Sequence, residues 1–374
     1  MNIQKTIKHI NSYIQSKGYI FEKGTAENLY LSLKTKPLLM LYGPEGCGKH
    51  SLIRLFCESI GITAQNKRFK TVSPYNNHIH PYRHMGFINS DNTFYPGEIL
   101  EFIMTAAEDR DNSYVLYISD LNTEDPDKYL HEIVKSMDTV RTDENGVLTS
   151  EPIFSADLFK SDTEKELFGN IRIPDNLYIV CSICRDEKWH TLSSNLKDRT
   201  NIIEIKSNNL NELPQCSNSC DPISDITNEF LKREYYDISH IENSSYTQMC
   251  VNILSEINKT LKYVGKEFGY RVRNEILFYL MLNNKYGLLT DNDALDNCIY
   301  QRILPKIDGV EPSLKNILSL IFKQCVTNGI GDYYSNSLKM FRSLNHTDCR
   351  YKKSAEKITF MTRRLEESGY CTFF

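Results

Sequence analysis

A glycine-rich loop between an apolar run and a helical segment constrains the fold of this chain more than any other feature. Residues 38–42 form an apolar run that is typical of a buried strand, and the pattern G-x-x-x-x-G-K follows at 43–49. Apolar residues then recur at helical spacing: Leu52, Ile53, Leu55 and Phe56. A strand, this loop and a helix in that order are the context that a phosphate-binding P-loop requires.

Such a loop binds polyphosphate through backbone N–H groups at a helix N-terminus, and its lysine reaches the β- and γ-phosphates. The alternative interpretation is a glycine turn before a helix, which needs no ligand. A chance match is expected about 0.05 times in a chain of this composition, so the pattern favours nucleotide binding. The predicted nucleotide-binding residues of the loop are Gly43, Pro44, Glu45, Gly46, Cys47, Gly48, Lys49, His50 and Ser51.

The residue after the P-loop lysine departs from the usual pattern. This position normally supplies a hydroxyl to Mg²⁺, but here it is His50. Imidazole is a poor ligand for a hard cation that prefers oxygen. Ser51 points about 100° further around the helix, although it could contact an α-phosphate. These residues argue against an ordinary Mg²⁺ site and leave the metal ligands unassigned.

A second metal-binding position is expected at the end of another apolar strand, 114–118. The residue there is Ser119, and Asp120 follows where a water-activating carboxylate would lie. Three interpretations are open. Asp120 is a displaced metal ligand, or the site lacks both usual ligands, or Asp120 is only a turn residue.

Two arginines are candidates for contact with a nucleotide. Arg199 ends a polar helical stretch, where an arginine usually forms a surface ion pair. In a ring of P-loop subunits it would instead be an arginine finger for the neighbour's γ-phosphate. Arg271 lies in the helical C-terminal part and is, taken alone, typical of a solvated helix arginine.

The alternation of strands and helices predicts an α/β fold with a parallel sheet covered by helices. We expect a helical lead-in at 1–36, a P-loop core at 37–206, a linker at 207–225 and a helical region at 226–374. Residues 74–96 are predicted to form a loop, and residues 140–172 an irregular surface excursion. The predicted strands of the core are 38–42, 69–72, 114–118, 177–184 and 202–205. Its predicted helices are 97–107 and 128–137.

Charge, apolar runs and cysteine spacing give no sign of a nucleic-acid-binding surface, a membrane span or a zinc site. The net charge of −4 gives no general attraction to nucleic acid or to anionic membranes. No apolar run reaches the roughly 18–20 residues of a membrane span. The eleven cysteines are scattered, and Cys181-x-x-Cys184 lies on an apolar run without a second pair at zinc spacing. We therefore expect reduced thiols and a cytoplasmic location.

These segments, in this order, resemble the McrB-type branch of the AAA+ ATPases, the NTPase subunits of modified-DNA restriction systems. Residues 85–89 are similar to the family's L-G-Y-x-N loop, and 119–122 occupy the place of its D-E-M-N Walker B motif. Residues 270–276 are similar to its lid helix with a sensor arginine. Further similar segments are 29–37, 173–180, 186–187, 192–204, 296, 301–307, 354–361 and 369–374.

The resemblance implies an AAA+ core followed by an all-helical lid, with ATP or GTP as ligand. It implies a homo- or hetero-oligomeric ring in which Arg199 faces the neighbour's nucleotide. Cys184 stands at sensor 1, where the family has Asn, and Asp120 stands where Walker B has Glu. Positions that hold metal or water are thus changed together, whereas Lys49, Arg199 and the sensor arginine Arg271 remain.

The implied function is a nucleotide-binding subunit of a bacterial DNA-restriction or anti-phage defence assembly, with weak or absent hydrolysis. Relatives that read DNA often carry an additional N-terminal recognition domain, whereas about 36 residues precede the P-loop here. Contact with DNA is therefore expected to be indirect, through a partner, with an effector or nuclease as a further partner. The alternative is a regulatory or structural pseudo-ATPase that docks on an active AAA+ or nuclease partner.

Overall fold

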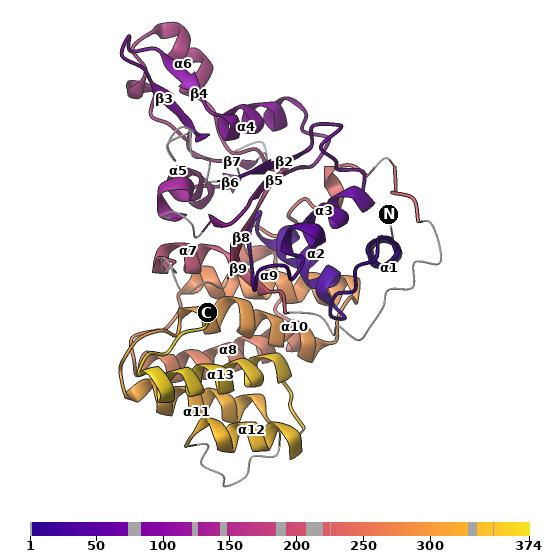
Figure 1. Ribbon diagram of the computed structural model, residues 1–374, viewed down its shortest axis with the longest axis vertical. Helices are drawn as coiled ribbons and strands as arrows, with labels where there is room; N and C mark the ends of the chain where they lie inside the picture. Colours follow the sequence, from indigo (N-terminus) through magenta and orange to yellow (C-terminus); the bar gives the residue numbers. More distant parts are fainter. Residues whose placement is uncertain are drawn as a thin grey trace. The chain divides into compact units, whose positions relative to one another are not determined.

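The computed structural model describes residues 2–73, 84–121, 126–142, 148–184, 192–206, 220–224, 226–327, 335–346 and 348–374. The chain divides into two compact units, residues 1–236 and 237–374. The first unit contains a parallel sheet with helices, and the regular elements described in the second are helices (Figure 1). The predicted α/β fold with a helical region is confirmed at this level. Of the predicted linker at 207–225, only 220–224 lie within the described residues.

The first unit is built on a five-stranded parallel sheet with the strand order β2-β5-β8-β1-β9. Every residue of β1 and β5 is buried, as expected of a parallel sheet with both faces covered. The five predicted strands are confirmed to within one residue at each end. They are β1 (Leu38–Gly43), β2 (Phe69–Val72), β5 (Tyr114–Ile118), β8 (Leu177–Cys184) and β9 (Asn201–Glu204).

The strand register decides which chain segments meet at the edge of the sheet. Strand β8 lies between β1 and β5, pairing Cys184 with Gly43 and Cys181 with Ile118. Because these strands are parallel, their carboxyl ends lie at one edge. The P-loop after β1, Asp120 after β5 and Cys184 at the end of β8 are therefore brought together.

Helices of the first unit cover this sheet and extend beyond it. Helix α3 packs against β1 and β8, α2 against β1, and α4 against β5, while α1 packs on α3 (Figure 1). Ile7, Ile10 and Ile14 form part of the buried face of α1. The helices are α1 (Ile3–Ser16), α2 (Thr25–Thr35), α3 (Lys49–Ser59), α4 (Glu98–Glu108), α5 (Pro126–Asp138), α6 (Asp162–Phe168) and α7 (Ser194–Arg199), with short 3₁₀ turns η3 (Ala156–Leu158) and η4 (Asn228–Phe230).

The predicted loop at 74–96 is wrong in its second half. Strands β3 (Gly86–Ile88) and β4 (Phe94–Pro96) form an antiparallel hairpin. Gly86 has a φ of 135°, and a Cβ there would lie 2.4 Å from the ring of Phe94. Three-residue strands are too short to show an alternating pattern, so the sequence did not reveal them. Residues 74–83 lie outside the described residues.

The predicted excursion at 140–172 is also more ordered than expected. It contains η3, α6 and the short strands β6 (Arg141–Thr142) and β7 (Leu148–Thr149). Four phenylalanine rings form a small core with centroids between 4.9 and 6.2 Å apart: Phe94, Phe154, Phe159 and Phe168. This core joins α6 to the β3–β4 hairpin, and the two lie side by side in Figure 1. Isolated aromatic residues in a polar stretch gave no periodic signal.

One buried asparagine fixes the turn before β5. The Asn176 amide donates to the backbone carbonyls of Ala106, Asp109 and Asn112 at 2.7–2.9 Å. We expect Asn176→Ala to lower the free energy of unfolding by about 2 kcal/mol, because the two N–H donors that the three carbonyls share are lost at roughly 1 kcal/mol each. Urea unfolding followed by circular dichroism measures this, and a loss below about 1 kcal/mol would contradict the assignment.

A buried lysine ties the end of the first unit to the helix before the P-loop strand. Lys34 on α2 is only 2% exposed. Its Nζ donates to the carbonyls of Glu229, Phe230 and Lys232 at 2.9–3.2 Å, and it lies 3.2 Å from the carboxylate of Glu234. The segment that leads to the second unit is thereby held against α2.

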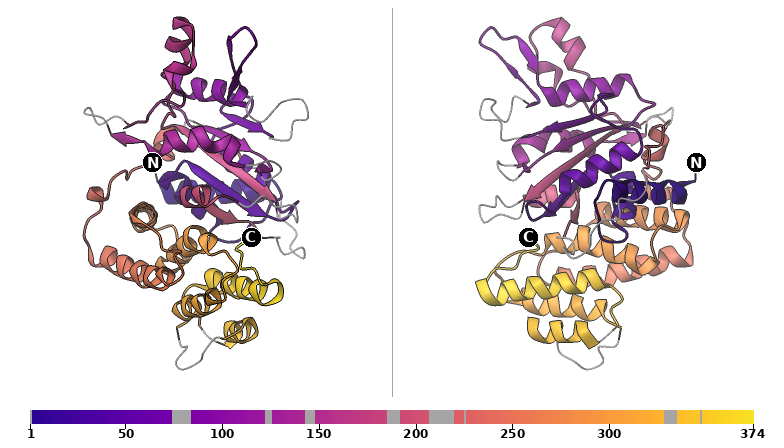
Figure 2. Two further views of the ribbon diagram at one scale, coloured as in Figure 1. Left: turned by 90° about the vertical axis from the view of Figure 1, so that its left-hand side faces the viewer. Right: turned by 45° about the vertical axis from the view of Figure 1, so that its right-hand side comes forward.

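The second unit is a helical assembly centred on α13. This helix contacts α10, α11 and α12, which appear with it in orange and yellow in Figure 2. Isolated bridges join Gly309 to Cys371 and Val326 to Cys349. The elements are α8 (Ser245–Lys262), α9 (Tyr270–Tyr286), α10 (Asp291–Cys298), α11 (Ser313–Cys325), α12 (Ser337–His346) and α13 (Lys352–Ser368), with short turns η5 (Ile238–His240), η6 (Ile299–Ile303) and η7 (Leu304–Lys306).

Buried polar contacts fix the packing of these helices. The Asp296 carboxylate on α10 accepts hydrogen bonds from the backbone N–H groups of Lys353 and Ser354, both at 2.8 Å, and so caps the start of α13. Arg302, in the π-helical turn η6, forms a buried ion pair with Glu275 of α9. These contacts join segments that are far apart in the sequence.

Candidate nucleotide-binding site

The P-loop adopts a concave conformation between β1 and α3. Gly46 and Gly48 have φ angles of 73° and 89°, in the left-handed region that favours glycine. Gly48 is the N-cap of α3 and, lacking a side chain, makes no side-chain capping bond to the first turn. A Cβ at Gly43 would lie 2.3 Å from the carbonyl oxygen of Ile205, so this position also requires glycine. The loop therefore presents helix N-terminal N–H groups in a concavity suited to an anion.

Lys49 is directed back onto the loop. Its Nζ donates to the carbonyls of Gly43 and Pro44 at 2.9 and 2.8 Å, and lies 3.9 Å from the sulfur of Cys47. The side chain is largely buried, with 7% of the residue exposed. A buried ammonium group needs partners, and these carbonyls supply them. A bound phosphate would compete with these partners for the three N–H groups of the ammonium.

A cavity of about 600 Å³ opens beside the loop, within the size range of ligand pockets. The P-loop side contributes Glu45, Gly46, Gly48, Lys49, His50 and Ser51. The ends of β2, β5 and β8 contribute Thr71, Tyr117, Ser119, Asp120, Ser182 and Cys184. Of the predicted loop residues, Gly43, Pro44 and Cys47 support the loop without lining the cavity. The structure thus brings the predicted residues Lys49, Asp120 and Cys184 to one site.

Asp120 and Cys184 contact each other across this site. The Cys184 thiol donates to Oδ1 of Asp120 at 3.0 Å, and the Asp120 N–H donates to the hydroxyl of Ser182 at 2.9 Å. Burial and this hydrogen bond raise the pKa of Cys184 to about 11, although Lys49 opposes the shift. The thiol is therefore protonated near neutral pH and acts as a donor to the carboxylate. Asp120 has a φ of 49°, which is uncommon outside glycine and turns the chain sharply after β5.

His50 lies against aromatic rings at the wall of the cavity. Its ring centroid is 5.0 Å from that of Tyr117 and 6.4 Å from that of Phe69. Burial, with a smaller contribution from Arg54, lowers the pKa of His50 below its usual value near 6.5. The imidazole is therefore neutral near pH 7. His50 thus replaces the hydroxyl ligand that the P-loop usually gives to Mg²⁺, and the oxygen donors left beside it are Ser119 and Asp120.

Tyr19 is a lining residue that the sequence did not reveal. It lies between α1 and α2, and its hydroxyl accepts a hydrogen bond from Ser51 at 3.1 Å. Its ring is stacked on that of Phe21, with the planes 7° apart. A Cβ on Gly48 would lie 3.3 Å from the Phe21 ring, so this aromatic pair stands directly beside the P-loop. No periodicity or motif marks these residues, and only the tertiary fold places them here.

Of the two predicted arginines, Arg199 belongs to the first unit and does not line this cavity. Arg199 pairs through Nε with the Asp138 carboxylate of α5 and donates through Nη1 to Asn195. Within one chain it is thus a surface ion pair, which was one of its two interpretations. Arg271 is exposed on α9 of the second unit.

No cluster of three or more histidine, cysteine, aspartate or glutamate side chains in the described ranges is arranged to hold a metal ion. Cys181 is fully buried in β8, where burial strongly raises its pKa. No disulfide joins the cysteines of the described part of the chain. Asn122 and residues 186–187, which contributed to the resemblance, lie outside the described residues.

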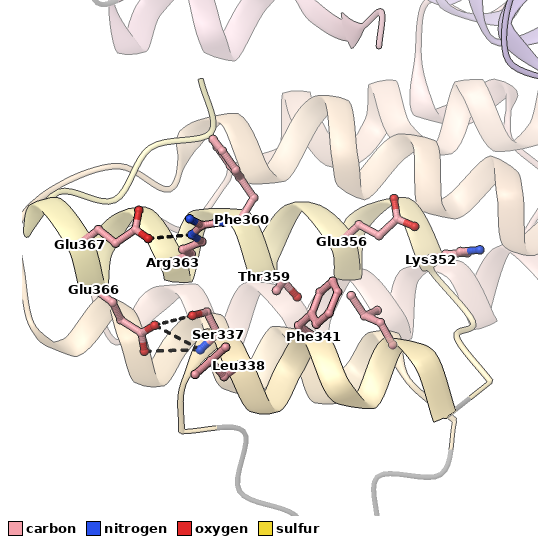
Figure 3. Close-up of a pocket in the computed structure, with 11 residues that line it drawn as sticks. Ser337, Leu338, Phe341, Lys352, Glu356, Thr359, Phe360, Arg363, Glu366 and Glu367 are labelled. Carbon is pink, nitrogen blue, oxygen red and sulfur yellow. Dashed lines mark hydrogen bonds and ion pairs between the residues drawn. The ribbon is translucent and has the colours of Figure 1, made fainter. Parts of the chain in front are cut away.

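A second cavity, of about 930 Å³, lies between α12 and α13 (Figure 3). Its apolar side chains include Leu338 and Phe341, which are 68% and 58% exposed. At one end Glu366 accepts hydrogen bonds from Ser337, and Arg363 pairs with Glu367. The cavity is an apolar groove with a charged rim.

A family model described as a domain of unknown function, DUF8727, matches residues 218–370, which is less than half of the chain. No curated protein matches. Among solved structures, the chain is similar to NtrX from Brucella abortus, at 12% identity and a TM-score of 0.29. That similarity covers 76% of this chain, which spans about half (53%) of the NtrX chain. No helix in the described ranges is both long and apolar enough to cross a bilayer.

Proposed function

We propose that this chain is a nucleotide-binding subunit of the McrB-like AAA+ type that binds ATP or GTP and hydrolyses it slowly or not at all. The observation that carries the proposal is the meeting of the P-loop, Lys49 and the Asp120–Cys184 pair around one cavity. The strand order adds support, because β1, β8 and β5 lie side by side in parallel, so that the P-loop, Cys184 and Asp120 meet at one edge of the sheet. The N–H groups of the loop would bind the phosphates, and Lys49 would exchange its loop carbonyls for phosphate oxygens.

Slow hydrolysis follows from the surroundings of Asp120. A carboxylate that activates water must accept a hydrogen bond from that water. Here the Cys184 thiol, which donates to Oδ1 of Asp120, would compete with such a water for that oxygen. The position after Lys49 carries an imidazole, and the end of β5 carries a serine. Binding is therefore better supported than turnover by the residues present.

The assembly is the second part of the proposal. We propose that the chain joins a homo- or hetero-oligomeric ring in the cytoplasm, where Arg199 would exchange Asp138 for a neighbour's γ-phosphate. The link to restriction or anti-phage defence rests on the resemblance of the motifs. Recognition of DNA and any nuclease activity would belong to partner proteins. The alternative, a regulatory pseudo-ATPase docked on an active partner, is favoured by the same occupied Asp120.

The test is the thermal stability of the full chain with ATP or GTP, with and without Mg²⁺, together with phosphate release. A ligand that binds only the folded state raises the unfolding temperature. We expect such a rise with little phosphate release. Steady release at the rates of motor ATPases would overturn the inactive assignment, and no rise with either nucleotide would overturn nucleotide binding itself.

Tyr19 is expected to contribute to nucleotide affinity. Tyr19 lines the cavity beside Ser51, and we propose that the nucleotide base lies against its ring. Stacking of a base on an aromatic ring contributes about 1–3 kcal/mol, so Tyr19→Ala should weaken binding roughly ten- to hundredfold. Tyr19→Phe is the matched control, because it keeps the ring and loses only the hydroxyl. Calorimetric titration measures both, and equal affinities for Ala and Phe variants would contradict the stacking role.

A further inference from the structure

We propose that the groove between α12 and α13 binds α12 of a second copy of this chain, so that two copies associate symmetrically through the same groove. The groove has a volume of about 930 Å³, and its lining combines apolar with charged side chains (Figure 3). This association goes beyond the proposed function, because the groove lies within the second unit and its lining does not include the P-loop.

Helix α12 has an apolar face that the described part of the chain leaves exposed. The helix packs on α13, and its Met340 is fully buried. Leu338 and Phe341 are instead 68% and 58% exposed, more than any other leucine or phenylalanine in the described ranges. They stand three positions apart and therefore lie on one face of the helix. A helix of this kind binds in a groove through such apolar residues at i and i+3.

A basic edge adjoins this apolar face of α12. Lys339 and Arg342 each follow one of the two apolar residues by one position, and both are exposed. One position corresponds to about 100° around the helix, so the two cations lie along the same edge. The sequence of α12 contains no aspartate or glutamate. An approaching α12 therefore presents apolar side chains with positive charge along one side.

The wall that α13 gives to the groove complements this pattern. Phe360 contributes an aromatic ring to the lining. The charged residues of the wall are three glutamates and two basic residues: Glu356, Glu366, Glu367, Lys352 and Arg363. The wall thus carries an excess of one negative charge beside its apolar area. Such a surface favours an apolar helix with a basic edge over one with an acidic edge.

Helix α12 is both a wall of the groove and a helix that fits it, so a two-fold axis satisfies both contacts at once. In such an isologous dimer each copy uses the same patch, and every substitution acts twice. The helix has 10 residues and is about 15 Å long. The buried area is therefore expected at the small end of the range for specific complexes, about 1,200 Å². We expect a correspondingly weak dimer, with a dissociation constant of about 10 μM.

The first experiment is sedimentation velocity of the full chain at about 1 to 100 μM, a range that brackets the expected constant. EDTA is present and nucleotide is left out. We expect a monomer–dimer equilibrium that weakens at high salt, because screening reduces the attraction between the basic edge and the glutamates. This measurement needs no variant. A monomer over the whole range would overturn the inference.

Substitutions then test which surface associates. Leu338→Glu and Phe341→Glu should each weaken the dimer about a hundredfold, since a central interface residue contributes about tenfold and acts twice. Leu320→Glu on α11 is the matched control, because Leu320 is 47% exposed and does not line the groove. It should leave the dimer unchanged. All three residues are exposed, so the unfolding temperature should stay within a few degrees of the wild type. A dimer that persists in both groove variants would overturn the inference.

One further variant separates this dimer from the proposed ring. Arg199→Ala removes the residue proposed to face a neighbour's nucleotide, and it lies in the first unit. We expect it to leave the nucleotide-free dimer unchanged. Oligomers that form only with nucleotide, and that Arg199→Ala disrupts while Leu338→Glu does not, would overturn this inference and support the ring.

Discussion

Replacing Lys49 by alanine should remove most of the stabilisation that ATP or GTP gives to the folded chain. Hydrogen bonds from a charged donor contribute about 1.5–3 kcal/mol each, so the loss of the ammonium group should weaken binding roughly a hundredfold. At a nucleotide concentration of 100 times the wild-type Kd, stabilisation is about 2.7 kcal/mol. The same concentration would stabilise the variant by only about 0.4 kcal/mol.

The ligand-free variant will also unfold at a lower temperature, because Lys49 donates to the carbonyls of Gly43 and Pro44 in the structure. The relevant quantity is therefore the shift caused by nucleotide, not the unfolding temperature itself. Lys5→Ala on the exposed face of α1 is the matched control, since it removes one positive charge away from the cavity. An unchanged nucleotide shift in Lys49→Ala would exclude the P-loop as the binding site.

Comparing Asp120→Asn with Lys49→Ala distinguishes a working NTPase from a regulatory pseudo-ATPase. If the chain is a working NTPase, both variants should abolish turnover. If it is a regulatory pseudo-ATPase, Lys49→Ala should break assembly, whereas Asp120→Asn should change little. Phosphate release together with the oligomeric state in solution distinguishes these outcomes.

The second large effect is expected in the helical unit. Arg302→Met should lower the free energy of unfolding of this unit by about 3–5 kcal/mol, because it leaves the buried Glu275 carboxylate without its ion-pair partner. Arg302 is 2% exposed, so water cannot easily take the place of the guanidinium group. Hydrogen exchange of α9 and η6 in the full chain measures the loss locally.

The double variant Arg302→Met with Glu275→Leu is the control for this prediction. Replacing both members of a buried ion pair by apolar side chains is often neutral or stabilising. We therefore expect the double variant to recover most of the lost protection. If the double variant is as unstable as Arg302→Met, the loss comes from packing in η6 and not from the unpaired charge.

The parts of the fold that the sequence predicts are those with strong periodicity. Strands β1, β5 and β8 are continuous apolar runs, and the P-loop has a pattern that rarely occurs by chance. Their parallel pairing then places Asp120 and Cys184 beside Lys49 without further information. Short elements held by distant contacts were not predictable, such as the β3–β4 hairpin, which packs on α6 through Phe94.

The candidate site likewise contains residues that the sequence pattern predicts and residues that only tertiary packing brings in. The residues that follow strands were predicted because strand ends converge, whereas Tyr19 enters the cavity from a turn between two helices. Arg199 had two possible partners, and the choice of Asp138 depends on how α5 and α7 pack. The spacing of residues in the sequence does not predict how these two helices pack. Whether Arg199 also serves a neighbouring subunit depends on an assembly beyond the single chain.

The contacts of Lys34 have a mechanical consequence. Three carbonyls at 229–232 and the carboxylate of Glu234 converge on one ammonium group, just before the chain leaves the first unit at residue 236. Tension applied to the chain from residue 237 onward would load the contacts of Glu234 and Lys232 first, and then those of Glu229 and Phe230 in η4. The load would then pass to α2, which leads directly into β1 and the P-loop. Lys34 would thus transmit force on the connecting segment to the strand that leads into the P-loop.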